Sequence, residues 1–145
     1  MATPSSLQKL ARRAILTKAK NSAALTALVP ASSINPDIEV AWPIVLLKSP
    51  RTLRLRAACV RGAIVSFDMH VFAGPRVVSG ATVETGEDHA VSIASAIEEL
   101  FVENMLTLDN GASCRTRFSD SQLLNDAEPD HWHWFSQLNC RVLSS

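Results

Sequence analysis

The chain has 145 residues, of which 47% are hydrophobic and 19% are charged. This composition is typical of a folded globular protein, so we expect one domain over residues 1–145 and exclude wholesale disorder. The 14 Lys or Arg residues balance the 14 Asp or Glu residues, and the formal net charge is zero. A neutral chain argues against a protein whose main task is to grip nucleic-acid phosphates.

The charges are unevenly distributed along the chain. The first acidic residue is Asp37, residues 48–61 form a second acid-free basic segment, and most acids occur from Glu84 onward. Such segregation favours contacts with charged partners or with other copies of the chain. Two separately solvated faces explain it equally well.

Cysteine content and hydropathy indicate a cytoplasmic protein. Cys59, Cys114 and Cys140 form no C-x-x-C pair, which is typical of reduced thiols. No apolar run approaches the ~20 residues of a membrane span, so we expect no membrane partner. Residues 1–20 are basic and amphipathic, like a mitochondrial transit peptide. We favour a structural helix instead, because the sheet predicted downstream needs a cover.

A first helix is predicted to begin at Thr3-Pro4, with Thr as the cap and Pro at the first helical position. Asn21-Ser22 ends it and caps a short second helical segment over residues 23–28. Residues 31–43 then form a connector. The apolar stripe of the first helix comprises Leu7, Leu10, Ala11, Ala14 and Ile15.

The clearest predicted strand covers residues 63–72, where side chains alternate between an apolar and a mostly polar face. Residues 44–47 predict a short buried strand that ends at Ser49-Pro50. Residues 53–57 predict either the start of a strand or a hairpin arm leading into the central strand. The expected buried face of that strand comprises Ala63, Val65, Phe67, Met69 and Val71.

Residues 73–86 are predicted to be a long loop. A helix follows, capped by Thr85 and extending to about Glu103. Glu87 and Asp88 lie in its first turn, where negative charge favours the helix dipole. Its apolar stripe comprises Ala90, Ile93, Ala94, Ile97, Leu100 and Phe101.

Further strands are predicted at residues 105–108, 113–119 and 131–143, with hairpin turns at residues 109–111 and 125–130. Because hairpins join most of the strands, the sheet should be antiparallel. The predicted fold is an α+β two-layer sandwich. It has a mainly antiparallel sheet of four to five strands, covered on one face by two amphipathic helices.

No catalytic or phosphate-binding motif is present, so we expect neither an enzyme nor a cofactor. Asp130, His131 and His133 form the most suggestive cluster, since histidines two apart on a strand point the same way and could share a metal. Cys140 points to the opposite face. Exposed histidines beside core tryptophans explain the cluster more simply, and we predict no metal site.

Two other groups of side chains have residue types that could support chemistry. Asp68 and His70 share one strand face and could form an acid–base pair, although a polar sheet face is the simpler interpretation. Cys59 and Cys114 lie near arginines that could activate a thiol, although inert thiols are the simpler interpretation. Neither group predicts a catalytic site.

Several segments of the chain occur in a recognisable order. They are an opening helix followed by NSAALTALVP, the step Trp42-Pro43-Ile44-Val45, the strand IVSFDMHVFA, a helix running into LTLDNG, and the final strand DHWHWFSQLNCRVL. Together they resemble the tail completion, or tail terminator, family of long-tailed bacteriophages, prophages and gene transfer agents. The resemblance covers nearly the whole chain and is weakest at residues 49–61 and 73–86.

The resemblance implies a structural virion protein of the tail or neck, assembled in the host cytoplasm. Members of the family form a ring, typically hexameric, at the head-proximal end of the finished tail tube. The ring stops polymerisation of the tube protein and offers a surface to the head–tail connector or stopper protein. DNA passes through its lumen without sequence-specific binding.

Charge segregation suggests which residues make these contacts. We expect a basic set to meet an acidic set on a neighbouring subunit, or acids of a tail partner. The candidates are Arg54, Arg56 and Arg61 in the basic set and Glu84, Glu87 and Asp88 in the acidic set. Two alternatives stay open: another neck protein, such as a head–tail stopper or adaptor, and a small metal-binding protein or enzyme using His131 and His133.

Overall fold

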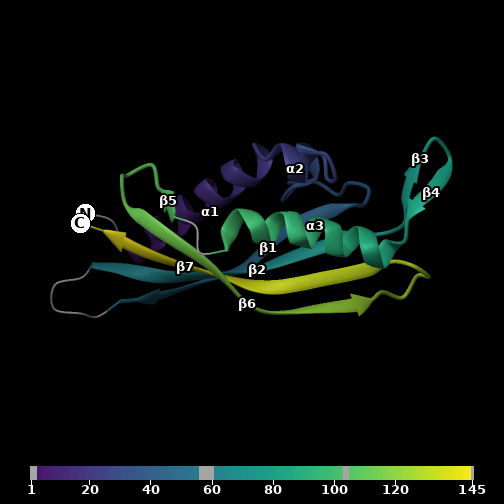
Figure 1. Cartoon of the computed structure of the whole chain (residues 1–145). Helices are drawn as coiled ribbons and strands as arrows, with labels where there is room; N and C mark the ends of the chain where they lie inside the picture. The colour runs from purple at the N-terminus through teal and green to yellow at the C-terminus, as the bar shows by residue number, and fades with distance from the viewer. Residues whose placement is uncertain (1–2, 56–60, 103–104, 145) are drawn as a thin grey trace.

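Figure 1 shows the computed structural model of the chain, in which a twisted sheet forms one layer and helices lie across one of its faces. The structure describes residues 3–55, 61–102 and 105–144. The two layers and the order of the elements confirm the predicted α+β fold. No helix within these described segments is long and apolar enough to cross a membrane.

The main sheet has five strands and is antiparallel throughout. In spatial order they are β1 (Ile44–Arg54), β2 (Arg61–Ala73), β7 (Trp132–Ser144), β6 (Ser113–Asn125) and β5 (Met105–Thr107). β2 pairs with β7 along its whole length and with β1 on its other side. The strand predicted most clearly from alternation is therefore an interior strand of the sheet.

The helices of the described chain are α1 (Pro4–Lys20), α2 (Ala23–Thr26), the 3-10 turn η1 (Ala31–Ser33) and α3 (Gly86–Phe101). α1 begins as predicted, because the Thr3 hydroxyl accepts a hydrogen bond from the Ser6 amide at 3.1 Å. Thr85 caps α3 in the same way, accepting from the Asp88 amide at 3.2 Å. Both caps satisfy amide groups that the first helical turn leaves free.

One face of β2 forms the core together with the helices. The predicted inward residues of β2, from Ala63 to Val71, are at most 2% exposed. The helices contribute Leu7, Ala11 and Ile15 from α1 and Ala90, Ile93, Ala94, Ile97 and Phe101 from α3. None of the described elements covers the opposite side of the sheet, which we call the uncovered face (Figure 1).

The first strand is longer than the sequence predicted. β1 continues through Ser49-Pro50, which was expected to end it. Pairing with β2 shifts between Lys48 and Arg51, and Ser49 has a φ of 52°. β1 is an edge strand, where a bulge can hold a proline without breaking an interior ladder. The strand then continues as the hairpin arm into β2, one of the two options that the sequence left open.

Residues 73–86 are not the unstructured loop that the sequence predicted. They contain a separate hairpin, β3 (Arg76–Val78) and β4 (Ala81–Glu84), which stands at one end of the molecule (Figure 1). Ser79 and Gly80 have φ values of 53° and 80°. Two consecutive positive φ values fit a two-residue type I′ turn, for which the Ser-Gly pair was the local signal.

Candidate interaction surfaces

Strand register determines which side chains meet on the uncovered face, because paired residues share a face. At one end of the sheet, the successive rows are Leu53, Ile64, Arg141 and Arg115, then Arg51, Ser66, Asn139 and Arg117. At the other end, Phe72 pairs with His133 and His70 pairs with Phe135. The uncovered face therefore has a basic end and an aromatic end.

The basic end carries three exposed arginines, Arg115 and Arg117 on β6 and Arg141 on β7, which we call the basic patch. Arg115 and Arg141 are direct cross-strand partners. Side chains in such a pair start from Cβ atoms ~5 Å apart, and like charges placed there repel each other. None of the three guanidinium groups forms an ion pair with a described residue, so no acid in the described part of the chain offsets this repulsion.

The aromatic end is a cluster of neighbouring rings. The ring centroids of Phe72 and His133 lie 4.1 Å apart, and those of His70 and His133 lie 4.9 Å apart. Phe135 lies 5.4 Å from His133, and Trp42 lies 5.2 Å from Phe72. All five side chains are partly exposed. Ring contacts of this kind contribute ~0.5–1.5 kcal/mol beyond area burial, which holds this end of the sheet in a defined shape.

A histidine pair forms the centre of the aromatic end. His70 Nδ1 and His133 Nε2 are 2.7 Å apart, so one imidazole donates a hydrogen bond to the other and the accepting ring is neutral. Burial lowers the pKa of His70 and of His133, and the charge of His70 lowers the pKa of His133 further. Asp68 raises the pKa of His70 and Asp126 raises that of His133, but these effects are smaller than burial. Burial therefore favours the neutral form of both imidazole rings.

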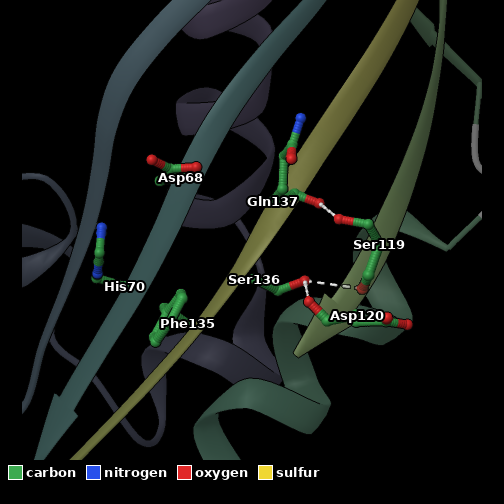
Figure 2. A pocket seen from close by; sticks show the side chains of 7 residues that line it. All are labelled: Asp68, His70, Ser119, Asp120, Phe135, Ser136 and Gln137. Carbon is green, nitrogen blue, oxygen red and sulfur yellow. Dashed lines mark hydrogen bonds between the residues drawn. The ribbon is translucent and has the colours of Figure 1, made fainter. Parts of the chain in front are cut away.

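A depression of about 340 Å³ lies beside His70, one member of the histidine pair (Figure 2). It is lined by Asp68, His70, Ser119, Asp120, Phe135, Ser136 and Gln137. β6 continues past its predicted end at Ser119, with a bulge between Phe118 and Ser121. The Ser136 hydroxyl lies 3.0 Å from the Ser119 carbonyl oxygen and 3.1 Å from that of Asp120, which satisfies groups that the bulge displaces from the ladder.

Asp68 and His70, which the sequence suggested as a possible acid–base pair, have different partners. Two guanidinium nitrogens of Arg51 donate to the Asp68 carboxylate at 3.0 and 3.3 Å. This hydrogen bonding lowers the pKa of Asp68, so the group is a carboxylate at neutral pH. Because His70 is bound to His133 instead, the geometry supports the simpler interpretation of a polar sheet face.

Two of the three predicted basic contact residues lie at one end of the sheet, where β1 ends and β2 begins. Arg54 is exposed and ends β1, and Arg61 begins β2. Arg56 lies outside the described residues. The basic patch lies at this same end of the sheet. Leu53, which precedes Arg54 in β1, lies in the same row as Arg141.

The predicted acidic contact residues lie at the opposite end. Glu84 ends β4, and Glu87 and Asp88 are exposed in the first turn of α3 (Figure 1). One oxygen of Glu84 accepts a hydrogen bond from Ser92 at 3.0 Å. β2, which separates the two ends, has 13 residues and spans ~40 Å. The structure therefore does not bring the basic and acidic sets together within one copy.

The candidate metal ligands have separate environments. His133 belongs to the aromatic end, whereas His131 precedes β7 and has Nε2 3.5 Å from the Glu128 carboxylate. Asp130 accepts a hydrogen bond from the Gly86 amide at 3.0 Å. In the part of the chain that the structure describes, no group of three or more His, Cys, Asp or Glu side chains is arranged to hold a metal ion.

Cys114 and Cys140 are free, buried thiols on the helix-covered face. The pKa of Cys140 is raised, first by its hydrogen bond to Cys114 and then by burial. The arginines that flank Cys114 in the sequence lie on the uncovered face, because side chains alternate along β6. They do not activate the thiol; Cys59 lies outside the described residues.

Sequence reasoning missed the basic patch as a unit. Alternation places Arg115, Arg117 and Arg141 on polar strand faces, but only the register of β6 with β7 brings them together. The available signal was the turn predicted at residues 125–130, between two alternating strands. His89 was also missed: it is 4% exposed on α3, and its Nδ1 lies 2.9 Å from the Gly74 carbonyl oxygen. Helix periodicity gave no sign of this contact.

The fold is that of a small α+β protein, and its distinctive surface features are the basic end and the aromatic end of the uncovered face. Residues 13–143 match the family described as tail completion protein gp17. The chain belongs to this family, which confirms the resemblance seen in the sequence, and it is a structural protein of phage-type tails.

A solved structure described as "Virion of native gene transfer agent (GTA) particle" contains a chain of similar fold. The two chains share a TM-score of 0.75 and 18% sequence identity, over 96% of this chain and 98% of that chain. No curated protein sequence matches the chain. The structural likeness therefore concerns the fold, and the family match concerns the kind of protein.

Proposed function

We propose that this chain, acting as one domain over residues 1–145, completes the tail by ending its tube. Copies form a ring, hexameric by analogy with the resembled family, at the head-proximal end of the tube. There they stop polymerisation of the tube protein and present a surface to the head–tail connector or stopper. DNA passes through the lumen, for which a neutral chain is suited. The chain acts in the virion tail or neck after assembly in the host cytoplasm, without catalysis.

The observation that carries the proposal is the placement of opposite charges at opposite ends of the molecule. A ring joins each copy to the next through two different patches. Arg54 at one end and Glu87 with Asp88 at the other are exposed and opposite in sign. We place these ends against each other across the subunit boundary. The full basic set is Arg54, Arg56 and Arg61, and the full acidic set is Glu84, Glu87 and Asp88.

Open sheet edges provide a second support for assembly. Among the described strands, β1 pairs only with β2, and β6 pairs with β5 only through Ser113, Cys114 and Arg115. Asn35 already bonds to the start of the outer edge of β1, at Val45 and Leu47. The rest of that edge, and the edge of β6 beyond Thr116, present backbone groups that another chain can meet. Such edges suit contact with the tube protein or with the connector.

Gold-labelled antibodies against the chain, applied to isolated particles and to separated heads and tails, test this proposal. We expect one label per particle, at the head-proximal end of the tail, and retention of the label on headless tails. Label distributed along the tube would contradict the role in ending it. Label retained on tailless heads would identify a stopper or adaptor instead.

A further inference from the structure

We propose that the basic patch on the uncovered face is a docking surface for helix α3 of a second copy of this chain. The inference rests on the proposed assembly of copies and names a contact within it. It goes beyond the contact between the basic and acidic sets at the two ends of the molecule, which we call the end patches. Arg115, Arg117 and Arg141 belong to neither set and lie on the face of the sheet.

Among the described residues, the basic patch is a set of like charges without an acidic partner. Arg115 faces Arg141 across the strands, and Arg117 lies two residues further along β6 on the same face. None of these side chains has an ion-pair partner among the described residues. Carboxylates brought to this row replace repulsion by attraction, which gives both affinity and orientation to a docking partner.

Exposed apolar side chains border the patch and indicate a protein partner. Leu53 is 65% exposed, Met105 is 55% exposed and Leu143 is 40% exposed. Register places all three on the uncovered face with the patch. Arginine surrounded by apolar side chains is typical of protein–protein contacts, whereas nucleic-acid surfaces are more polar.

The outer face of α3 has the complementary chemistry. Residues 86–101 contain no Lys or Arg. Val91 is 47% exposed and Val102, the C-cap, is 52% exposed. Spacings of three or four residues place side chains in one stripe along a helix. The stripe, which we call the acidic stripe, comprises Glu87, Val91, Ser95, Glu98 and Val102.

The two surfaces also match in size. From Glu87 to Glu98 the acidic stripe is ~16 Å long at the rise of an α-helix. The row from Leu53 to Arg115 crosses three interstrand spacings, or ~14 Å. One helix can therefore cover one row of the basic end, with Glu98 over the adjacent Arg115 and Arg141 and Val91 over Leu53.

Docking α3 of one copy on the uncovered face of the next joins two different surfaces, as a ring requires. The basic patch and Arg54 lie at the same end of the sheet, and the acidic stripe begins with Glu87. The same head-to-tail arrangement therefore brings the end patches together and places the helix on the sheet.

Arg141→Glu separates docking from folding. The substitution gives Arg115 an acid directly opposite, so the melting temperature of the folded chain does not fall, but the docking row loses its complementarity to the acidic stripe. Sedimentation velocity of the full chain, alone and with isolated tails, measures the protein concentration at which half of the chain is assembled. We expect this concentration to rise about tenfold. Glu98→Arg in the same chain should restore assembly. Arg12→Glu, at an exposed position on α1, is the matched control and should assemble like the unaltered chain.

The outcomes distinguish this inference from the proposed function. If Arg141→Glu assembles normally, the docking surface is wrong and the role in the tail stands. If Arg141→Glu fails to assemble and Glu98→Arg does not restore it, α3 is not the occupant. Normal assembly with a specific loss of DNA retention would assign the patch to nucleic acid and overturn the inference. If the unaltered chain assembles neither alone nor on tails, the proposed function fails as well.

Discussion

Arg115 and Arg141 lie directly opposite each other on β6 and β7, and neither forms an ion pair with a described residue. Like charges in a direct cross-strand pair weaken the isolated sheet. The same pair becomes favourable when another surface brings carboxylates to it. In the proposed assembly, the pair of arginines lowers the stability of the single copy slightly and strengthens its contact with the next copy.

The repulsion between these arginines predicts a stabilising substitution. Arg141→Glu should raise the free energy of unfolding of the isolated chain by ~0.2–1 kcal/mol, because it creates an opposite-charge pair with Arg115. Urea unfolding measures this change, with Arg141→Lys as the control that keeps the positive charge and should leave stability unchanged. A less stable Arg141→Glu chain would show that Arg141 has a favourable local partner.

Contact between the two ends of neighbouring copies predicts a charge-swap effect. Arg54→Glu should weaken assembly about tenfold, because it sets an acid against Glu87 and Asp88 of the next copy. Glu87→Arg in the same chain should restore much of the loss. Sedimentation velocity and the fraction of joined particles in micrographs measure both effects. Lys20→Glu, at an exposed position at the end of α1, is the control. Unimpaired assembly of Arg54→Glu would rule out this contact.

The start of α3 packs tightly against the turn between β6 and β7. A Cβ at Gly86 would overlap the carbonyl oxygen of Asp130, whose side chain also accepts a hydrogen bond from the Gly86 amide. Gly86→Ala should therefore destabilise the chain by ~1–3 kcal/mol, as overpacking does. Gly74→Ala is the control, since its Cβ would meet only the movable His131 ring at 3.2 Å. Equal melting temperatures for the two variants would contradict this view of the contact.

The histidine pair predicts that stability falls in mild acid. Burial lowers the pKa of His70 and His133 in the folded chain, so the unfolded chain binds more protons below its own pKa of ~6.5. The stability is fully present above that pH and is lost as the pH falls toward the folded pKa values. Thermal unfolding between pH 7.5 and pH 5 should show this loss, and His133→Phe should reduce its slope. A slope that is unchanged in His133→Phe would contradict this account of the pair.

Local signals in the sequence were enough for much of the fold. Alternation over residues 63–72 and the caps at Thr3 and Thr85 depend on neighbouring residues alone, and all three predictions are confirmed. The path of β1 through Ser49-Pro50 was not predictable in this way, because a proline is tolerated there only at a sheet edge. Ser79-Gly80 is a local turn signal inside the predicted loop, and the structure forms a hairpin turn there.

The candidate surfaces were less predictable than the fold. Charge segregation along the chain selects the residues of the two ends, but their separation by the length of β2 emerges only from the topology. The basic patch depends on the register of two strands, including the shift at the bulge after Phe118. A register error of one residue would have turned its arginines toward the core.

The most direct test of the claim that this chain ends the tail tube is the length and joining of tails in its absence. Electron micrographs of particles produced after deletion of the coding sequence, with and without complementation, measure both quantities. We predict over-long tails, or finished tails unattached to heads, and a return to uniform joined tails on complementation. Tails of normal length that are correctly joined to heads in the deletion would contradict the account.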